Sequence, residues 1–387
     1  MQATFEKFVR ELDELCRRRA ADYPARLEAY TALSNKITDL CHWLQSQRSL
    51  DWQPDPTIIK QADTLTPIFV CGHYKSGTTF IRDLLDSHPQ LSVLPGDGRL
   101  FELMNNTKSL PATKRAQLLR EFWLHKVVNP TGLPPFWMFG QDVTPYSNFL
   151  CYLDYWLKEN EEPDARLITA VGKAYYSANP FRSPQVRHWV DKTPVQELHI
   201  DILLGFYPKA RFIHVVRNPL ASLAAIKTMT AKRGRRFYLI NHLPTFRASL
   251  QQGLKNQNRL GESRYIIIRY EDTLANPHSL MHLLTQHFGL IDSDLTPTIN
   301  GMLSTPNSAY EENRVRGKIQ KQSLERWRTV LTSTEIAHVV DALHGEATAY
   351  GYNLEDLYQS NRLQRTSLRA IRSLSRLVQA AWHHLRH

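Results

Sequence analysis

One short stretch constrains the fold of this 387-residue chain more than any other. It runs from residue 67 to residue 90 and reads PIFVCGHYKSGTTFIRDLLDSHPQ. The apolar run before Gly72 predicts a buried strand, and the apolar residues after Gly77 recur at helical spacing. A tight loop must therefore join a strand end to a helix start. Joins of this kind are typical of α/β proteins, whose ligands bind at the carboxyl ends of parallel strands.

The loop GHYKSGTT predicts an anion site. Backbone N–H groups at a helix start lack intrahelical partners, and the helix dipole is positive there. Two glycines let the backbone curl close to a bound anion, and three hydroxyl side chains can donate hydrogen bonds. The candidate binding residues are Gly72, His73, Tyr74, Lys75, Ser76, Gly77, Thr78 and Thr79.

The position of Lys75 argues against a nucleoside triphosphate as the ligand. A triphosphatase loop reads G-x-x-x-x-G-K-[ST], with the lysine after the second glycine. Here Lys75 comes before Gly77, inside the curl. From there an ammonium can contact an oxygen that bridges two anionic groups and can stabilise charge on a leaving group.

Two further apolar runs, RFIHVVRNP (211–219) and YIIIRYED (265–272), are typical of buried parallel strands. Arg217 ends the first run, and Asn218 and Pro219 suit the N-cap and first residue of a following helix. A guanidinium at this strand end can bind a phosphate through two hydrogen bonds. We therefore expect a second anion site at Arg217, although an arginine here could instead pair with a carboxylate at the sheet edge.

Together these motifs resemble those of sulfotransferases that use 3′-phosphoadenosine 5′-phosphosulfate (PAPS). KSGTT before an apolar helix is similar to their 5′-phosphosulfate loop, and DSHP (86–89) is typical of the tyrosylprotein and bacterial branch. The resemblance covers roughly residues 67–96 and 190–350. It implies a P-loop kinase-like, three-layer α/β fold with a mostly parallel central sheet. It also implies in-line transfer of a sulfuryl group from PAPS to an acceptor hydroxyl or amine, with no metal.

The 3′-phosphate motif of the family departs from this sequence at one position. The family has a serine eight residues after its arginine, whereas this chain has Ala225 there. Either Ser222, one helical turn earlier, takes that role, or another donor completes the site. The stretch NRVRGKIQKQSLERW (313–327) resembles the basic loop that closes over the 3′-phosphate and adenine. Its candidate binding residues are Arg314, Arg316, Gly317 and Lys318.

Sulfuryl transfer also needs charge stabilisation and a base for the acceptor hydroxyl. The resemblance implies that Lys75 contacts the phosphosulfate. Asp97 follows a further candidate strand in LSVLPGDGRLFE, and the resemblance matches it to the catalytic glutamate of the tyrosylprotein enzymes. Glu102 and His73 are the alternative bases. Lys192, in WVDKTPVQEL, matches a lysine that approaches the sulfate. We expect it to lie opposite Lys75 as a second catalytic ammonium.

Composition and charge narrow the classes of ligand and the cellular location that we expect for this chain. A net charge of +11 favours anionic ligands, but the basic residues are spread out and away from the aromatic segment, so nucleic acid is not expected. The sequence shows neither a signal-peptide core nor an apolar run of membrane-spanning length, so we expect a cytoplasmic protein. The four cysteines fit no zinc pattern and are expected to be free thiols: Cys16, Cys41, Cys71 and Cys151.

The chain divides by pattern into a helical N-terminal extension (1–62), an α/β sulfotransferase domain (63–355) and a basic tail (356–387). Residues 51–66 are interpreted as a linker. An insertion at about 97–190, rich in aromatics and proline, is expected either to build an acceptor-side pocket or to pack as a helical subdomain. The tail has amphipathic helical spacing, so it could lie peripherally on an anionic membrane, cap the domain or bind a partner protein. The acceptor is expected to be a small molecule, a glycan or a lipid.

Two other classes of protein remain as alternatives. A P-loop nucleotide kinase or NTPase would need its lysine at the helix start, together with magnesium. A non-enzymatic protein that binds anionic ligands or membranes would agree with the charge alone. Tight binding of 3′-phosphoadenosine 5′-phosphate (PAP) without magnesium, with much weaker binding of ATP, would distinguish the sulfotransferase from both.

Overall fold

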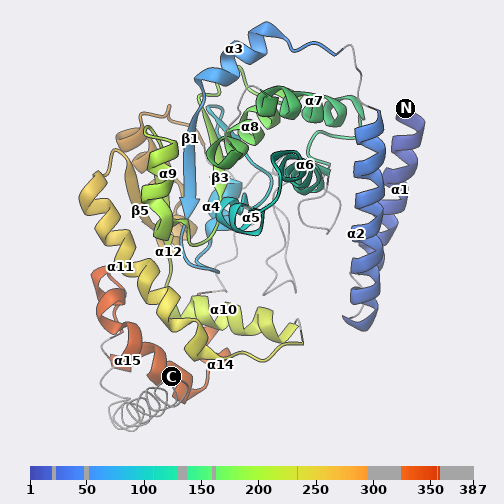
Figure 1. Cartoon of the computed structure of the whole chain (residues 1–387). Helices are drawn as coiled ribbons and strands as arrows, with labels where there is room; N and C mark the ends of the chain where they lie inside the picture. Colours follow the sequence, from blue (N-terminus) through green and yellow to red (C-terminus); the bar gives the residue numbers. More distant parts are fainter. Residues whose placement is uncertain are drawn as a thin grey trace, which may run out of the picture.

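A five-stranded parallel sheet lies at the centre of the chain (Figure 1). The structure is a computed structural model that describes residues 1–19, 23–47, 52–107, 109–128, 137–158, 163–232, 234–294, 324–354 and 356–357. The strand order is β2-β3-β1-β4-β5. The strands are β1 (Thr66–Cys71), β2 (Leu91–Val93), β3 (His188–Lys192), β4 (Arg211–Val216) and β5 (Tyr265–Arg269). The predicted α/β fold class is confirmed.

Strand β1 is the middle strand of the sheet, and both of its faces are covered. Its residues from Pro67 to Cys71 are buried, and the ring of Phe69 packs against Trp189, Tyr207 and Phe212. After β1 the chain runs to the edge strand β2, returns through β3, and then passes to the other side of β1 to form β4. The direction of the connections therefore reverses at β1, and its carboxyl end is where a ligand is expected in such a sheet.

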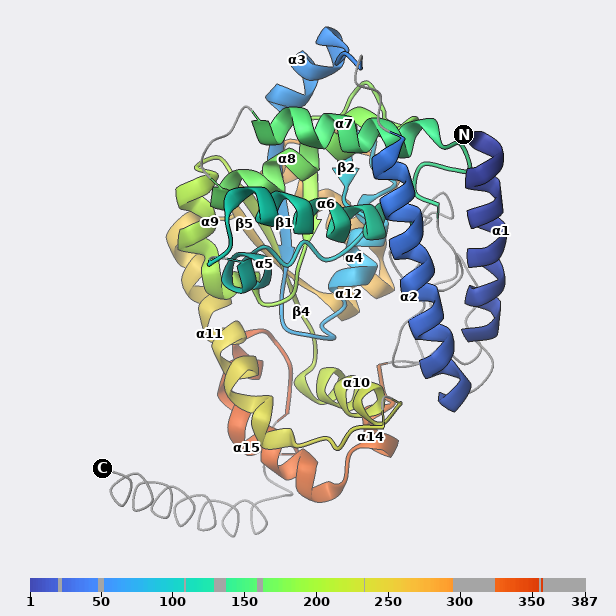
Figure 2. The same ribbon diagram turned by 45° about the vertical axis from the view of Figure 1, so that its right-hand side comes forward.

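Helices surround the sheet, and Figures 1 and 2 show three groups of them. Helices α1 (Gln2–Arg19) and α2 (Tyr23–Ser46) form an antiparallel pair to one side. Below the carboxyl end of β1 lie α10 (Pro219–Lys232), α11 (Leu243–Leu260) and α15 (Ser333–Ala349). The third group belongs to the predicted insertion: α5 (Leu100–Thr107), α6 (Ala112–Val128), α7 (Thr144–Lys158) and α8 (Pro163–Ala178).

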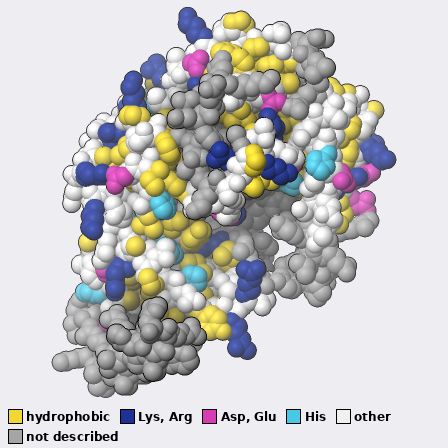
Figure 3. Space-filling view, in the orientation of Figure 1, with side chains coloured by type: hydrophobic (Ala, Val, Ile, Leu, Met, Phe, Trp, Pro, Cys, Tyr) yellow, Lys and Arg dark blue, Asp and Glu magenta, His cyan; other side chains and the backbone are white. Residues whose placement is uncertain are grey.

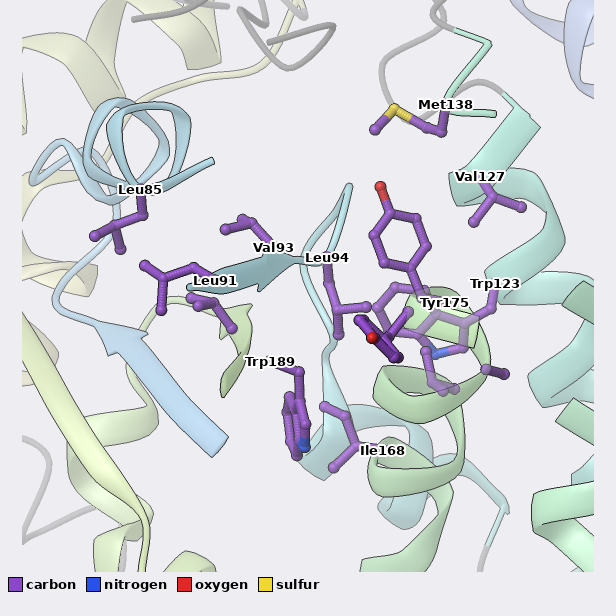
Figure 4. Close-up of a cluster of buried hydrophobic side chains, with 14 of the residues drawn as sticks. Leu85, Leu91, Val93, Leu94, Trp123, Val127, Met138, Ile168, Tyr175 and Trp189 are labelled. Atoms are coloured by element: carbon purple, nitrogen blue, oxygen red, sulfur yellow. The ribbon is translucent and has the colours of Figure 1, made fainter. Parts of the chain in front are cut away.

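The helices of the third group cover the β2–β3 side of the sheet with an apolar core. Figure 4 shows Tyr175 and Ile168 of α8 and Trp123 of α6 beside Leu94 and Trp189, which come from the end of β2 and from β3. All five of these side chains are buried. This side of the sheet is therefore packed rather than open. The division of the chain at residues 62, 97, 190 and 355 stays a prediction.

Shorter elements complete the described chain. They are α3 (Pro56–Thr64), α4 (Thr78–Leu85), the 3₁₀ turns η1 (Gln196–His199) and η2 (Leu239–Asn241), α9 (Ile200–Phe206), α12 (Tyr270–Ala275), α13 (Pro277–Leu283), the π-helical turn η3 (Leu284–Phe288) and α14 (Trp327–Val330). The loop from Gly72 to Thr79, here called the phosphate loop, leads into helix α4, and α12 begins directly after β5. Both helix starts therefore lie at the carboxyl edge of the sheet.

The interpretation of residues 51–66 as a linker is wrong, because they contain α3. The Asp55 carboxylate caps this helix by accepting hydrogen bonds from the N–H groups of Thr57 (2.8 Å) and Ile58 (3.3 Å), and Pro56 occupies its first position. Gln61 donates to the carbonyl of Pro184 at 2.8 Å. An aspartate followed by a proline is a helix-start signal, so the sequence did carry this information.

Strand β3 was not predicted from the sequence, which suggested only a turn around Lys192. It pairs with β2 on one side and with β1 on the other. Its last two residues, Asp191 and Lys192, are both buried. Charged residues are almost never fully buried unless they are paired, and a sequence does not reveal their partners. For this reason HWVDK did not look like a core strand.

The surface adds two observations. Lysine and arginine side chains are scattered over the face seen in Figure 3 rather than gathered in one stripe. Within the described residues, no helix combines the length and apolarity needed to cross a bilayer. The basic tail from residue 358 onward lies outside the described residues, so its predicted amphipathic helix is not described.

Truncating Phe69 should destabilise the fold, because its fully buried ring contacts three other rings. We expect Phe69→Ala to lower the free energy of unfolding by about 3–5 kcal/mol. The control is Phe181→Ala at a ring that is 65% exposed, which should change it by less than about 0.5 kcal/mol. Urea denaturation followed by circular dichroism measures both values. Equal losses for the two variants would contradict the central place of β1.

Candidate active site

The loop between β1 and α4 has a backbone that requires its two glycines. Gly72 has a φ of +136° and Gly77 a φ of +101°. A Cβ atom on Gly72 would lie 2.3 Å from the carbonyl oxygen of Val215, and one on Gly77 would lie 2.1 Å from the ring of Tyr270. Side chains at these positions are therefore excluded both by conformation and by space. The predicted glycine roles follow from this geometry.

Lys75 adopts the left-handed conformation, with a φ of +66°, which is uncommon for a residue with a side chain. The turn closes through a hydrogen bond from the Ser76 N–H to the His73 carbonyl at 3.1 Å. The Lys75 carbonyl accepts a hydrogen bond from Nη1 of Arg217, also at 3.1 Å. Unusual backbone conformations of this kind persist where the surroundings enforce them, and they gather at binding sites.

Arg217 reaches the loop because β4 lies next to β1. Cys71 and His214 are partners across the two strands, so Arg217 comes just past the end of β4, beside the loop. Its guanidinium lies over the ring of Tyr270, 4.6 Å from the ring centre, and its side chain is buried. Tyr270 therefore forms one surface that supports both Gly77 and Arg217. Two residues predicted from separate motifs, Lys75 and Arg217, are thus in direct contact.

Two buried serine hydroxyls belong to the segments that carry these motifs. Ser76 lies in the loop, and Ser222 lies in the first turn of α10. Neither hydroxyl oxygen has a hydrogen-bond partner among the described residues, and the two residues are 1% and 0% exposed. A buried hydroxyl without a partner costs about 1–3 kcal/mol. A phosphate oxygen would remove that cost, so the residues fit a ligand with two anionic groups.

The start of helix α4 favours an anion as well, whereas the start of α10 is capped by protein groups. Gly77 has no side chain with which to cap α4, so the first N–H groups of α4 are left to other acceptors. At α10 the predicted cap is confirmed: the Asn218 side chain accepts a hydrogen bond from the Leu220 N–H at 2.9 Å. The Asn218 N–H in turn donates to the Glu271 carboxylate at 3.0 Å. Helix α10 is thereby held at the end of β4.

The buried Lys192 and the partly exposed Asp97 form an ion pair. Lys192 ends β3 opposite Val70 of β1, and its ammonium donates a hydrogen bond to the Asp97 carboxylate. Burial by itself would raise the pKa of Asp97, but Lys192, Lys126 and Arg82 outweigh it and hold the pKa below its ordinary value. Asp97 is therefore ionised at neutral pH, as a general base must be. Its positive neighbours also weaken its affinity for a proton.

A second carboxylate supports the turn that carries Asp97. Asp191 is fully buried and accepts hydrogen bonds from the Thr193 hydroxyl (3.1 Å) and the Gln196 amide (2.9 Å). Burial raises its pKa to about 6. A Cβ on Gly98 would lie 2.3 Å from Asp191 Oδ1, and the Arg99 N–H donates to the Thr193 hydroxyl at 3.1 Å. Sequence reasoning missed Asp191, although it stands next to Lys192.

Arg82 and Asp83 of α4 were also missed, because a polar helix face usually points to solvent. Both are buried and pair with each other at 2.8 Å. Arg82 also donates to the carbonyl of Pro95 at 3.3 Å. It thereby ties α4 to the turn that carries Asp97. The burial of these two residues could be predicted only by knowing that α4 is covered on both sides, and the sequence does not show this.

The two alternative bases lie in different surroundings. His73 is 3% exposed, its ring packs 4.3 Å from that of Phe246, and burial lowers its pKa to about 4. It is therefore a neutral imidazole at physiological pH. Glu102 is mostly exposed and pairs with Arg99 at 3.4 Å. Asp97, by contrast, pairs with the predicted catalytic ammonium of Lys192.

The remaining predicted residues have simple placements. Tyr74 is half-exposed, whereas Thr78 is buried and Thr79 partly buried. Among the residues that the structure describes, no group of His, Cys, Asp and Glu side chains could hold a metal ion. The predicted basic loop lies outside the described residues, so nothing tests Arg314, Arg316, Gly317 and Lys318.

Comparison with known proteins places these observations in a family. The sequence model of the sulfotransferase family matches residues 67–294. The omega-hydroxy-beta-dihydromenaquinone-9 sulfotransferases of Mycobacterium bovis and Mycobacterium tuberculosis are each 24% identical to this chain over 303 residues, which is 68% of this chain and 74% of theirs.

Solved structures are similar to this chain as well. The sulfotransferase domain of the Synechococcus olefin synthase is 21% identical, with a TM-score of 0.49, and covers 80% of this chain and 98% of its own. The sulfotransferase domain from the curacin biosynthetic pathway is 16% identical, with a TM-score of 0.48, and covers 75% and 98%.

The ion pair should make a pH-dependent contribution to stability. Because the pKa of Asp97 is depressed in the folded protein, this contribution is present above the ordinary aspartate pKa and is lost as the pH falls through the folded value. Asp97→Asn leaves Lys192 buried without its carboxylate, so we expect a loss of about 3 kcal/mol at pH 7. The difference from the wild type should shrink below about pH 4. Urea denaturation at several pH values measures it, and a difference independent of pH would contradict the pairing.

Proposed function

Because this chain belongs to the sulfotransferase family, we propose that its two anion sites hold the two ends of PAPS. The 5′-phosphosulfate lies in the loop from Gly72 to Thr79, and the 3′-phosphate lies at Arg217. The chain is a sulfotransferase, which moves a sulfuryl group from a donor to an acceptor. The proposal concerns where the donor binds and which residues act on it.

The contact between Arg217 and the Lys75 carbonyl carries this proposal. It brings the end of β4 against the loop, so that two anion sites lie side by side at the carboxyl edge of the sheet. The hydroxyls of Ser76 and Ser222 have no hydrogen-bond partner in the described part of the chain, so each of the two segments has one donor for a ligand. A nucleoside with separate 3′ and 5′ phosphate groups has the matching arrangement of charge, whereas a triphosphate carries its charge in one chain.

The residues divide the chemistry of the transfer. The acceptor oxygen forms a bond to sulfur while the bond from sulfur to the bridging oxygen breaks, and PAP leaves. Lys75 stabilises the charge that develops on the leaving phosphate. Asp97 takes the proton of the acceptor hydroxyl, since it is ionised and can then become neutral.

The ion pair gives Lys192 a role coupled to that of Asp97. Before transfer, the Asp97 carboxylate holds the Lys192 ammonium. When Asp97 receives the proton it no longer carries the opposing charge, and Lys192 is released to interact with the sulfuryl oxygens. Proton transfer from the acceptor therefore increases the positive charge available to the transferring group. Because proton transfer precedes the release of Lys192, the negative charge on the sulfuryl group is stabilised most strongly when the acceptor reacts.

We propose a lipid hydroxyl as the acceptor. The similar mycobacterial enzymes are named for omega-hydroxy-beta-dihydromenaquinone-9, and this supports a hydroxylated lipid over a glycan or a small polar molecule. Incubating the protein with ³⁵S-labelled donor and separated lipid, glycan and protein fractions of a cell extract tests this directly. Label in the glycan or protein fraction alone would exclude a lipid acceptor.

A lipid acceptor agrees with the proposal that the protein is cytoplasmic and contacts the membrane peripherally through its basic tail. Flotation with liposomes of the whole chain and of a variant that ends at residue 357 separates the contribution of the tail. Loss of flotation in the shortened variant is expected, and equal flotation would exclude the tail as the membrane contact.

The nature of the donor can be tested by calorimetry. PAP should bind without magnesium and at least about 100-fold more tightly than ATP, because ATP has no 3′-phosphate to bind at Arg217. Each ligand is titrated with and without magnesium. Comparable affinity for ATP, or a requirement for magnesium, would instead favour a nucleotide kinase or NTPase.

The two anion sites can be tested separately. Lys75→Ala should abolish turnover without changing the free energy of unfolding, whereas Lys60→Ala, at an exposed lysine of α3, should leave turnover unchanged.

Arg217→Ala should raise the donor KM by a few tens of fold, about 2–3 kcal/mol for a charged hydrogen bond. The control for the Arg217 variant is Arg187→Ala. Arg187 is exposed and directly precedes β3, at the amino-terminal edge of the sheet, opposite the loop. Retained turnover in the Lys75 variant, or an unchanged KM in the Arg217 variant, would contradict the assignment of that residue.

A further inference from the structure

A buried carboxylate lies directly behind the phosphate loop. Glu197, in η1, is fully buried, and its Oε2 accepts a hydrogen bond from the Gly72 N–H at 2.8 Å. The first amide of the loop therefore points to Glu197 and is not available to a bound anion. Neither the loop motif nor the family resemblance drew attention to this residue.

Glu197 is itself held from several sides. Its Oε1 accepts a hydrogen bond from the hydroxyl of Ser249 in α11, and its backbone carbonyl accepts one from the side-chain amide of Asn256, at 2.9 Å. Ser249 and Asn256 are also buried, at 1% and 0% exposure. Both carboxylate oxygens are thus occupied by donors, and the side chain has a single defined position.

The segment that carries Glu197 contacts Gly72 twice. The Val195 N–H donates to the Gly72 carbonyl at 2.9 Å, while the Gly72 N–H donates to Glu197. Val195 has a φ of +60°, so the backbone takes an unusual conformation to make this contact. The segment begins three residues after Lys192. Both backbone groups of Gly72 are therefore bonded to the chain that continues from β3.

Electrostatics argues against a direct role for Glu197 in binding the donor. Burial raises the pKa of Glu197, and its hydrogen bonds oppose that shift, because a buried carboxylate is unfavourable without them. A negative charge behind an anion site would also repel an anionic ligand. Hydrogen bonds to an ionised acceptor are about twice as strong as neutral ones, so the carboxylate is effective at holding an amide in place. The arrangement suits anchoring of the loop rather than attraction of the ligand.

We propose that Glu197 is a positioning residue that anchors Gly72, so that the phosphate loop and the Lys192 segment keep a fixed spacing. The two ammonium groups, Lys75 in the loop and Lys192 at the end of β3, then lie on either side of the transferring group. This inference rests on the proposed binding of the 5′-phosphosulfate in the loop. It adds a residue that acts through the loop and does not touch the donor.

The test uses two ligands that differ at the 5′ position. PAP has a 5′-phosphate for the loop, and adenosine 3′-monophosphate does not. We expect Glu197→Ala to raise the Kd of PAP by about tenfold or more and to leave the Kd of adenosine 3′-monophosphate within about twofold. A general loss of structure would weaken both ligands together, and that outcome would overturn the proposal.

A conservative variant sharpens the test. Glu197→Gln keeps an oxygen for the Gly72 N–H, and its amide can donate to the Ser249 hydroxyl. It should therefore restore the PAP Kd to within about threefold of the wild type, or tighten binding because the negative charge is gone. A glutamine variant as weak as the alanine variant would overturn the anchoring role, and so would wild-type affinity in the alanine variant.

One more variant keeps the test decisive if Glu197→Ala does not fold. Glu197→Asp retains the charge but is one methylene shorter, so it cannot reach both Gly72 and Ser249 as Glu197 does. We expect it to raise the Kd of PAP selectively, and an unchanged Kd would overturn the proposal. The result is separable from the proposed function: failure of the wild-type protein to bind PAP contradicts the donor assignment, whereas wild-type binding with unaffected variants contradicts only the role of Glu197.

Discussion

The hydrogen bond from Arg217 to the Lys75 carbonyl is the interaction on which the rest of the site depends. It requires β4 to lie beside β1 in parallel register, so that the end of one strand meets the loop that follows the other. It also requires Lys75 to adopt a left-handed backbone conformation, which turns its carbonyl toward Arg217. This one contact therefore brings Lys75 and Arg217, which come from separate sequence motifs, together at the carboxyl edge of the sheet.

Three carboxylates of the site have different tasks. Asp97 pairs with Lys192, Asp191 supports the turn around Gly98, and Glu197 anchors Gly72. None of them is adjacent in sequence to the residue or turn that it contacts. Burial would make such charges unfavourable if they lacked partners, so the packing of the insertion and of α11 is what allows them. The stability of the fold and the chemistry of the site thus rest on the same side chains.

Sequence reasoning succeeded where the signal was local. It located four of the strands, the loop glycines and the Asn218 cap, since each depends on a few neighbouring residues. It failed for β3, whose buried Asp191 and Lys192 imitate an exposed turn, and for α3, whose cap at Asp55 was interpreted as part of a linker. It also treated Arg82 and Asp83 as a simple polar face, although both are buried.

The amino-acid sequence by itself determined the phosphate loop, the strand that precedes it and the arginine at the end of β4, because glycine conformation, helix starts and apolar runs are encoded within about ten residues. Only the tertiary structure decided which groups these elements meet. Gly72 is bonded to Glu197, 125 residues away, and Asp97 to Lys192, 95 residues away. Hydrogen bonds and ion pairs act over a few ångströms in space, so no local pattern in the chain specifies partners at such separations.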